Sequence, residues 1–342
     1  MPMQDARRAA VVTGLGGWLP PRVLDNAELE QRLDTSDEWI RNRTGIRERH
    51  VVDPGLSTVD MAVEAGRCAL RSAGSDVVDA LVLATATPDY LCPASAPEVA
   101  SRLGLGGVAA FDVNAVCSGF VYALATAAGL IAGGVAGRVL VVGSDAFTTL
   151  LDPDDRSTVP IFGDGAGAVV LRAGTADELG ALGPFDLHSD GELTDLLVVP
   201  AGGAKQRRSA DPRDHFLAMQ GTAVFRQASA RMAESSRVVL DRMGWSVGEV
   251  DRFVGHQANI RILNAVAKQL GLPPEGLVIN VDRTGNTSAA SIPLALTDAC
   301  VAGSLHAGDR VLVSAFGAGL TWGSTALRWP DLPKVESPRV GE

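Results

Sequence analysis

Short runs of aliphatic and β-branched residues alternate along the chain with longer Ala-rich segments. A short continuous apolar run predicts a strand that is buried on both faces, whereas a longer Ala-rich segment predicts a helix. The predicted strands are Val11–Gly14, Ala80–Ala84, Val139–Gly143, Ala168–Leu171 and Val311–Ala315, and the predicted helices are Thr58–Ala73, Ser118–Ala132, Ala223–Met243 and Asn259–Leu270. This alternation predicts an α/β architecture.

One segment, Val116–Gly137, contains no charged residue. It is long enough to span a bilayer, but it contains five glycines, which are unfavourable inside a helix. A helix that is apolar on all sides is more simply the buried centre of a large α/β protein. The apolar run after Arg8 is soon broken by Gly14, Gly16 and Gly17, so we expect neither a secretory signal nor a membrane anchor.

Part of the first half of the chain is repeated in the second half. Leu124 recurs as Leu294, at an offset of 170 residues. The run that begins at Arg138 recurs at Arg310, at an offset of 172 residues. Both offsets are close to half of the 342 residues, which is typical of a duplicated unit. Chance similarity between stretches rich in Ala, Gly and Val is the alternative.

A duplication has two consequences for the organisation of the chain. It predicts two related halves, residues 1–175 and 176–342. It also places Cys117 opposite Thr287, so that two equivalent helix starts would meet across a pseudo-twofold axis.

The overall charge is −10, from 40 acidic and 30 basic residues, and no block of Lys or Arg occurs. This distribution argues against nucleic-acid binding, and an acidic partner would require a local basic patch. The four cysteines have no paired spacing, and no CxxC or His-rich pattern suggests a zinc site. We therefore expect reduced thiols, no metal and a cytoplasmic protein.

Cys117 lies near the beginning of the charge-free segment, at the predicted start of a helix. The free N–H groups and the partial positive charge of a helix N-terminus favour a thiolate. Cys117 is therefore a candidate nucleophile. A packed core thiol is the alternative, because free cysteines are often buried.

Polar residues further along the chain lie in turns that could present them to a substrate. His256 follows a short apolar run and is a candidate general base or oxyanion donor, with a structural histidine as the alternative. Asn286 precedes a predicted helix, where it could instead be a cap. Phe316–Leu320 contains glycines that would let backbone N–H groups approach a ligand, or that would only form a tight turn.

Two glycine clusters do not fit phosphate-binding loops. Gly14–Gly17 continues into Trp18 and two prolines rather than into a helix, so the dinucleotide-binding pattern fails. Phe162–Gly167 precedes a predicted strand, and we interpret its glycines as positions of tight packing.

Together, these motifs resemble those of one known family. The resemblance is to β-ketoacyl-acyl-carrier-protein synthase III, the initiating condensing enzyme of type II fatty acid synthesis, and it spans about residues 10–330. The matching segments are Asp34–Ile40, Arg43–Arg47, Phe162–Gly167, His256–Asn259, Gly285–Ala290 and Phe316–Gly319. The resemblance implies the thiolase fold, a duplicated five-layered αβαβα arrangement with two mixed sheets around buried central helices.

The resemblance also implies roles for individual residues. Cys117 takes the place of the nucleophile, His256 and Asn286 take the other two catalytic places, and the backbone N–H groups of Cys117 and Ala318 take those of the oxyanion hole. Further matches are the coenzyme A-binding positions Trp39, Arg43, Arg156, Phe225 and Asn259, the carrier-protein-binding positions Arg226, Arg261 and Lys268, and the acyl-pocket positions Cys92, Phe147, Phe162 and Met219. In this family the position of Cys92 is donated across a homodimer.

The implied reaction is a decarboxylative condensation. Cys117 would accept an acyl group from acyl-CoA and condense it with malonyl-carrier protein, without a metal or redox cofactor, to start a fatty acid or a polyketide. The alternatives are an acyltransferase that does not decarboxylate and a non-catalytic subunit that binds carrier protein. Asn286 favours condensation, whereas Gly255 departs from the usual Pro and Ala318 lies in a loop that has only Gly in some members.

We expect the chain to act as a cytoplasmic homodimer. Its partners would be acyl carrier protein and coenzyme A thioesters, and it would bind neither nucleic acid nor a membrane. The acyl primer, and the choice between a fatty acid and a polyketide pathway, are left open by the sequence.

Overall fold

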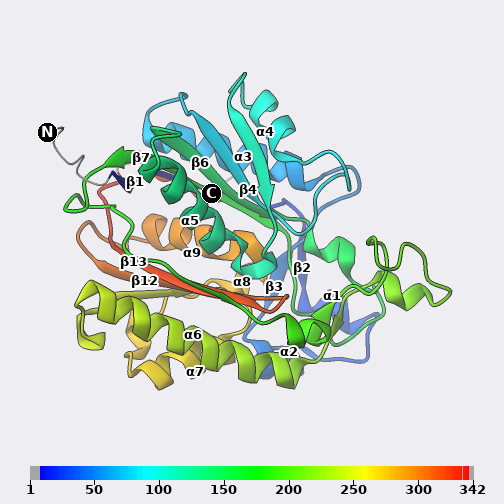
Figure 1. The fold of residues 1–342 in the computed structure, drawn as a ribbon. Coiled ribbons are helices and arrows are strands. Elements are labelled where there is room, and N and C mark those ends of the chain that lie inside the picture. Colours follow the sequence, from blue (N-terminus) through cyan, green and yellow to red (C-terminus); the bar gives the residue numbers. More distant parts are fainter. Residues whose placement is uncertain (1–7, 333, 339–342) are drawn as a thin grey trace, which may run out of the picture.

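The computed structural model describes residues 8–332 and 334–338, which form alternating layers of helices and sheets (Figure 1). The first sheet is mixed and has the strand order β1-β7-β6-β4-β5. In it, β4 runs parallel to β5 and β6, whereas β7 runs antiparallel to β1 and β6. The bounds are β1 (Ala9–Trp18), β4 (Ala80–Ala84), β5 (Ala109–Val113), β6 (Arg138–Asp145) and β7 (Gly165–Gly174).

The second sheet is also mixed and has the strand order β11-β12-β13-β8. Only the β11–β12 pair within it is parallel. Two short ribbons, β2–β3 and β9–β10, lie apart from the large sheets. The bounds are β8 (Asp186–Ser189), β11 (Arg252–Gly255), β12 (Arg310–Gly317), β13 (Thr321–Arg328), β2 (Val23–Asp25), β3 (Glu48–His50), β9 (Leu197–Val198) and β10 (Ala218–Met219).

Helices form the other three layers. α3 and α4 cover the outer face of the first sheet, α5 and α9 lie between the sheets, and α6 and α7 cover the outer face of the second sheet (Figure 1). The short helices α1, α2 and α8 lie near the β2–β3 ribbon. The bounds are α1 (Asn26–Glu30), α2 (Asp37–Thr44), α3 (Thr58–Ala73), α4 (Ala96–Arg102), α5 (Gly119–Ala132), α6 (Gly221–Met243), α7 (Ile260–Leu270), α8 (Val281–Thr284) and α9 (Ser291–Val301).

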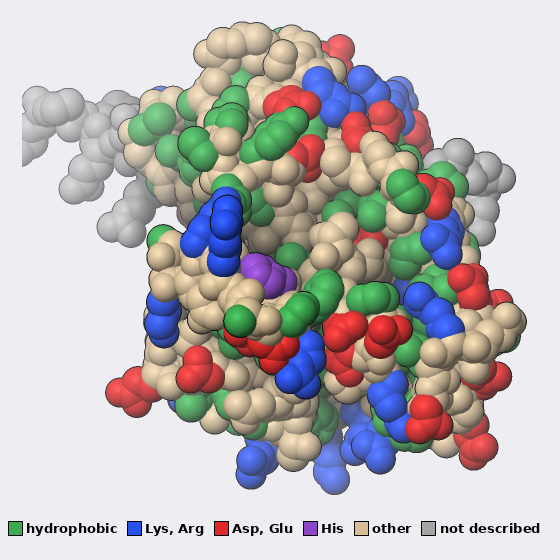
Figure 2. All heavy atoms as spheres, turned by 90° about the vertical axis from the view of Figure 1, so that its right-hand side faces the viewer, with side chains coloured by type: hydrophobic (Ala, Val, Ile, Leu, Met, Phe, Trp, Pro, Cys, Tyr) green, Lys and Arg blue, Asp and Glu red, His purple; other side chains and the backbone are tan. Residues whose placement is uncertain are grey.

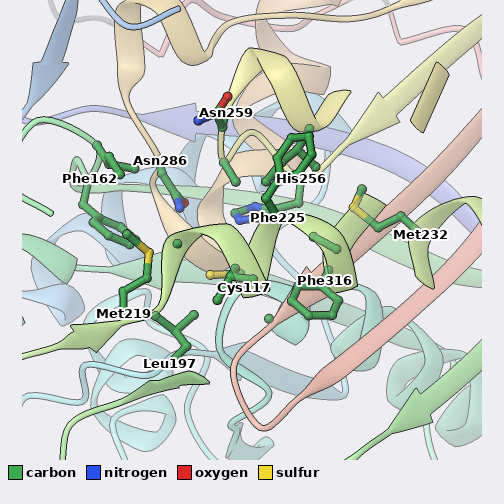
Figure 3. Close-up of a pocket in the computed structure, with 17 residues that line it drawn as sticks. Cys117, Phe162, Leu197, Met219, Phe225, Met232, His256, Asn259, Asn286 and Phe316 are labelled. Atoms are coloured by element: carbon green, nitrogen blue, oxygen red, sulfur yellow. The ribbon is translucent and has the colours of Figure 1, made fainter. Parts of the chain in front are cut away.

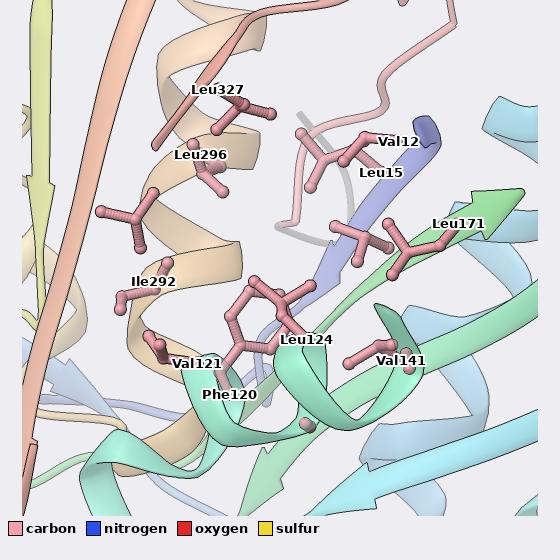
Figure 4. Packing of buried hydrophobic residues seen from close by; sticks show 14 of the residues in the cluster. Val12, Leu15, Phe120, Val121, Leu124, Val141, Leu171, Ile292, Leu296 and Leu327 are labelled. Atoms are coloured by element: carbon pink, nitrogen blue, oxygen red, sulfur yellow. The ribbon is translucent and has the colours of Figure 1, made fainter. Parts of the chain in front are cut away.

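Apolar clusters fill the spaces between the layers. In the central cluster, Phe120 and Leu124 of α5 meet Ile292 and Leu296 of α9 between the two sheets (Figure 4). The charge-free segment therefore forms a middle-layer helix, as its composition predicts. The five-layered arrangement with two mixed sheets confirms the predicted fold class. Among the described residues, no helix combines the length and the apolar character that a membrane span requires.

The prediction for β1 was wrong at its carboxyl end. The strand continues to Trp18, through the glycines that were expected to end it. These glycines are needed because α3 packs directly on β1. A Cβ atom on Gly14 would lie 2.4 Å from the carbonyl oxygen of Ala69, and one on Gly16 would lie 2.4 Å from the Ala69 nitrogen. Glycine in a strand interior thus marks a close backbone approach here.

The sequence repeat corresponds to two similar units, in which a 3₁₀ turn leads into α5 and β6 or into α9 and β12. The turns are η1 (Val116–Ser118) and η7 (Ser288–Ala290), and each begins with a non-glycine residue at positive φ, +46° in Val116 and +50° in Ser288. These two residues are 172 positions apart, so Cys117 lies opposite Ala289.

The predicted equivalence of Cys117 with Thr287 was therefore wrong. The offset of 170 residues came from a match inside the helices, but α5 has 14 residues and α9 has 11. A match within helices of unequal length does not fix the register at their starts. The boundary predicted at residue 175 falls directly after β7.

Candidate active site

A cavity of about 710 Å³, counted with its open mouth, lies beside α6 and reaches the start of α5 (Figure 3). Its walls include the three predicted catalytic residues Cys117, His256 and Asn286. They come from η1, from the turn after β11 and from the loop before η7. Each of the three residues is only 4% exposed, so the fold brings them together in the buried part of this cavity.

Cys117 is held by a strained turn between β5 and α5. Val116 has a φ of +46°, which is unfavourable for a β-branched residue. Its backbone N–H donates a hydrogen bond to the side-chain oxygen of Asn114 at 3.2 Å. The turn places Cys117 on the cavity wall rather than in the apolar core (Figure 3). This position favours a nucleophile over the alternative of a packed core thiol.

The thiol of Cys117 is protonated in the resting protein. Its pKa is raised to about 12, chiefly by burial; the Ser288 hydroxyl acts in the opposite direction, and the nearby Asp145 carboxylate contributes to the rise. This result is opposite to the expectation from the helix N-terminus alone, because loss of hydration outweighs the partial charge of the helix. The nucleophile therefore needs a proton acceptor.

The backbone N–H groups of Cys117 and of Ala318, in the loop that packs against Cys117, make no hydrogen bond to another residue within the described part of the chain. A Cβ atom on Gly317 would lie 2.9 Å from the Cys117 nitrogen, so only glycine lets the Phe316–Gly319 loop approach this closely. Two free donors beside a nucleophile suit the negative oxygen of a tetrahedral intermediate.

His256 follows β11 and is held at both its backbone and its ring. Its backbone N–H donates to the Ser314 carbonyl oxygen at 2.8 Å, and its Nδ1 lies 2.7 Å from the Ser291 hydroxyl. Burial lowers the pKa of His256 to about 3, so the imidazole is neutral. A hydroxyl can donate or accept, so Ser291 is compatible with either ring tautomer. Within the described residues, Nε2 makes no hydrogen bond and is free to act on a substrate.

Asn286 is locked to two neighbouring segments. Its backbone N–H donates to the Ile161 carbonyl oxygen at 2.9 Å, and its carbonyl oxygen accepts from the N–H of Gly163 at 3.0 Å. Its side-chain oxygen accepts from the N–H of Ser288 at 2.9 Å, which leaves the amide NH₂ for the cavity. A Cβ atom on Gly163 would lie 2.4 Å from the Thr284 carbonyl oxygen, so the glycines of Phe162–Gly167 do serve tight packing.

The predicted coenzyme A positions form a cluster that continues into the cavity. The guanidinium groups of Arg43 and Arg156 lie 5.3 and 5.1 Å from the centre of the Trp39 ring. Asn259 caps α7, donates to the Arg43 carbonyl oxygen at 3.1 Å and lines the cavity. Phe225 lines the cavity as well. The cluster therefore leads from exposed cations to the buried thiol.

The predicted carrier-protein positions are all exposed on the outer helices. Arg226 lies on α6, and Arg261 and Lys268 lie on α7, which packs beside α6. The Arg261 guanidinium lies 5.8 Å from the centre of the Phe225 ring, so this surface adjoins the cavity. Lys and Arg side chains stand along the lower edge of the face in Figure 2, where the α6–α7 layer lies.

The predicted acyl-pocket positions are not all in one place. Phe162 and Met219 line the cavity, and Phe147 stacks on Phe162 with ring centres 4.6 Å apart. Cys92 lies on the exposed surface, beside Leu91, and is not part of the cavity wall of its own chain.

Sequence analysis missed several residues that build the site. Ser291 holds the ring of His256, and the fully buried Gln257 donates to the carbonyl oxygens of Gly255 and Val278. The available signal for Gln257 was its position directly after the candidate base His256. Other missed wall residues are apolar and carry no distinctive signal: Ile161, Leu197, Val224, Ala228, Met232 and Ile262. Within the described residues, no group of three or more His, Cys, Asp or Glu side chains is placed to hold a metal ion.

Comparison with known proteins identifies the family of the chain. Residues 111–191 match the model of 3-oxoacyl-[acyl-carrier-protein] synthase III, and residues 240–329 match that of its C-terminal part. The chain is 60% identical over 327 residues to the β-ketoacyl-[acyl-carrier-protein] synthase III 5 of Streptomyces coelicolor, covering 95% of this chain and 98% of the relative.

Solved structures agree as well. The 3-oxoacyl-(acyl carrier protein) synthase III of Pseudomonas aeruginosa superposes with a TM-score of 0.90 at 54% identity, covering 95% of this chain and 99% of the other. The priming β-ketosynthase of the R1128 polyketide pathway superposes with a TM-score of 0.89 at 36% identity, covering 96% and 98%. The chain therefore belongs to the β-ketoacyl-acyl-carrier-protein synthase III family of condensing enzymes.

Proposed function

We propose that the chain takes an acyl group from acyl-CoA onto Cys117 and condenses it with malonyl-carrier protein. The observation that carries this proposal is one cavity whose walls hold a buried thiol, a neutral imidazole and a free amide. The product is a β-ketoacyl thioester that starts a fatty acid or polyketide chain. The chemistry requires neither a metal ion nor a redox cofactor.

The first step is acyl transfer. The neutral imidazole of His256 accepts the Cys117 proton at Nε2, and the sulfur attacks the thioester carbonyl. The N–H groups of Cys117 and Ala318 stabilise the negative oxygen. The carbon–sulfur bond to coenzyme A then breaks, and the departing thiolate takes the proton back from His256.

The second step is decarboxylation and condensation. Between the two steps the imidazole changes tautomer, so that Nε2 carries the proton and Nδ1 accepts from the Ser291 hydroxyl. The Nε2–H of His256 and the NH₂ group of Asn286 then donate hydrogen bonds to the malonyl thioester oxygen. Carbon dioxide leaves, and the electron pair of the broken bond is held as an enolate. The α-carbon attacks the acyl group on Cys117, a carbon–carbon bond forms, and the Cys117 sulfur leaves as a thiolate that takes a proton from water.

Exposed cations and an aromatic ring support the binding of both thioester substrates, acyl-CoA and malonyl-carrier protein. Trp39 with Arg43 and Arg156 offers an aromatic face and two cations to the nucleotide and phosphates of coenzyme A. The exposed cations on α6 and α7 offer a patch to an acidic carrier protein, although the overall charge is −10. Acyl carrier protein and coenzyme A thioesters are therefore the proposed partners.

The first sheet supports a homodimer. Its edge strand β5 is partly exposed along its whole length, and Tyr90 and Leu91 are 63% and 75% exposed. The segment that carries them is tied to β5, because the N–H of Ser95 donates to the Asp112 carboxylate at 2.8 Å. An open edge strand beside exposed apolar side chains suits pairing with a second copy of the chain. Cys92 in this segment would then face the partner's acyl pocket.

Mass spectrometry of the intact protein tests the proposal. Wild type and Cys117→Ser are incubated with acetyl-, butyryl-, isobutyryl- and hexanoyl-CoA and then with malonyl-carrier protein. We expect an acyl adduct on wild type alone, followed by its loss together with formation of a β-ketoacyl-carrier protein. Transfer of the acyl group without release of carbon dioxide would instead identify an acyltransferase. Failure of every acyl-CoA to form an adduct would refute the catalytic role.

A further inference from the structure

His256 and Asn286 reach the cavity of Cys117 from different elements (Figure 3). His256 follows β11, whereas Asn286 follows α8 and Gly285. In the proposed second step both side chains donate to one oxygen atom, and such donors must be held within about 0.5 Å of the productive geometry. The first step uses His256 but not the amide of Asn286. The spacing between the turn after β11 and α8 is therefore a requirement of condensation alone.

The side chain of Gln257 lies between these two elements. It is fully buried, and all four hydrogen-bonding positions of its amide are used. The NH₂ group donates to the carbonyl oxygens of Gly255 at 2.8 Å and Val278 at 3.0 Å. The side-chain oxygen accepts from the backbone N–H groups of Asn280 at 3.0 Å and Val281 at 3.3 Å. One side chain therefore ties the turn after β11 to the start of α8.

The short helix α8 connects the Gln257 contacts to Asn286. The Asn280 carbonyl oxygen accepts from the N–H of Thr284 at 3.1 Å, and the Val281 carbonyl oxygen accepts from the N–H of Gly285 at 3.1 Å. These bonds span the whole of α8, and Asn286 is the next residue after Gly285. A displacement of Asn280 and Val281 therefore also displaces Asn286.

His256 has supports that do not involve the Gln257 side chain. Its backbone N–H donates to the Ser314 carbonyl oxygen of β12 at 2.8 Å, and its Nδ1 lies 2.7 Å from the Ser291 hydroxyl. Gly255, the residue before it, is paired with Ser314 in the second sheet. Loss of the Gln257 amide should therefore move α8 relative to His256, rather than move His256 within the sheet.

We propose that Gln257 is a positioning residue that sets the spacing between the His256 and Asn286 donors for condensation. The inference rests on the proposed function and adds a residue that acts on it from outside the cavity, since Gln257 does not line the wall. Without its amide, two carbonyl oxygens and two N–H groups would be buried without these partners. Buried polar groups rarely stay unpaired, so the two elements would shift.

The test compares the two half-reactions in Gln257→Met and Gln257→Glu. Formation of the acetyl adduct from acetyl-CoA, and its loss on addition of malonyl-carrier protein, are followed by intact-protein mass spectrometry. Gln257→Met should acylate at close to the wild-type rate but condense roughly ten- to a hundredfold more slowly, because a displacement of about 1 Å costs up to a hundredfold. Gln257→Glu keeps an acceptor oxygen and should lie between wild type and Gln257→Met.

Leu81→Ala is the control for lost stability. Leu81 is fully buried in β4, in the cluster that faces α3 and α4 on the far side of the first sheet. Its truncation should lower the melting temperature while the ratio of the two half-reaction rates stays at the wild-type value. A merely structural role of Gln257 would give the same unchanged ratio in Gln257→Met and would overturn the inference.

Combining Gln257→Met with Asn286→Ala tests whether Gln257 acts through Asn286. If it does, the double variant should condense no more slowly than Asn286→Ala alone. Multiplied losses would overturn the inference. If Gln257→Met does not fold, Gln257→Glu decides the question in the same two comparisons, with folding checked by thermal melting. If wild type acylates but never condenses, the proposed function fails, and this inference fails with it.

Discussion

The turn that leads into α5 and the turn that leads into α9 share one backbone design but differ in what they leave open. Each begins with a residue at positive φ and passes through a 3₁₀ turn into a middle-layer helix. In the first turn, Cys117 keeps its N–H free within the described residues. In the second turn, the equivalent Ala289 donates its N–H to the Asp145 carboxylate at 3.0 Å.

Asp145 accounts for much of this difference. It is fully buried and also accepts from the N–H of Ala86 at 2.7 Å and from the hydroxyls of Thr85 and Thr87 at 3.1 Å. A buried carboxylate with this many donors saturates the start of α9. The duplicated turns have thus diverged. The first turn keeps the Cys117 N–H for a substrate. In the second turn the equivalent N–H is bound to Asp145, and Asn286 lies in the loop before it.

The largest expected effect comes from moving the thiol from the first turn to the second. Cys117→Ala should abolish acyl-enzyme formation, and adding Ala289→Cys to it should not restore the adduct. The second turn lacks a free N–H, and Ala289 is only 1% exposed. Intact mass after incubation with acetyl-CoA measures both. An adduct on the double variant, or on Cys68, Cys92 or Cys300 in Cys117→Ala, would show that the first turn is not special.

Removing the His256 imidazole should have the next largest effect, because it acts with Cys117 in the first proposed step and with Asn286 in the second. His256→Ala should lower condensation by roughly a hundred- to a thousandfold, because one donor to the enolate oxygen is lost. Its acyl-enzyme should form slowly but completely. The rate should rise about tenfold per pH unit between pH 7 and 9, because burial raises the pKa of Cys117 to about 12 and only the thiolate reacts. A rate independent of pH would contradict this account.

The carrier-protein surface concerns the second step alone. Arg261→Glu should raise the malonyl-carrier protein concentration needed for half-maximal rate by several-fold to tenfold, and the wild-type rate should fall as salt is added. Acylation by acetyl-CoA should stay close to wild type. Arg67→Glu, on α3 at the opposite outer layer, is the matched control. Equal loss in both variants would place docking elsewhere.

The smallest expected effect is on protein stability, and it comes from changing Asp145 at the turn that leads into α9. Asp145→Asn sets an amide NH₂ against groups that also donate, which should cost about 1–3 kcal/mol and lower the melting temperature by several degrees. Asp112→Asn is a matched variant at the start of α4, where the half-buried carboxylate accepts from Ser95 and Ala96. It should lose less. An unchanged melting temperature in Asp145→Asn would mean that Asp145 does not hold the second turn.

Regular, well-capped elements could be predicted from the sequence. Thr58–Ala73 and Ala80–Ala84 match α3 and β4, because Ser57 caps α3 at its start and Gly74 ends it at a φ of +63°. The short ribbons β2–β3 and β9–β10 were missed, since strands of two or three mixed residues have no clear period. The end of β1 was misplaced because glycines that break a local pattern also permit close packing of α3.

The site could be predicted only in part, for a different reason. The family motifs identified Cys117, His256 and Asn286, and the cavity contains all three. The pKa of Cys117 could not be foreseen, because it depends on burial and on Asp145, which come from the folded surroundings rather than from neighbours in sequence. The support that Ser291 gives His256 is likewise a contact across 35 positions.

The central claim is that Cys117 of the first turn carries the acyl group, whereas Asn286, before the second turn, is needed only for condensation. Asn286→Ala tests this claim most directly. Wild type and variant are first acylated with acetyl-CoA, freed of excess reagent and then mixed with malonyl-carrier protein, while the intact mass is followed in time. Both proteins should acquire the acyl adduct at similar rates. Wild type should then lose the adduct to condensation, and the variant should retain it roughly a hundredfold longer or more. Loss of the adduct at the wild-type rate in Asn286→Ala would contradict the account.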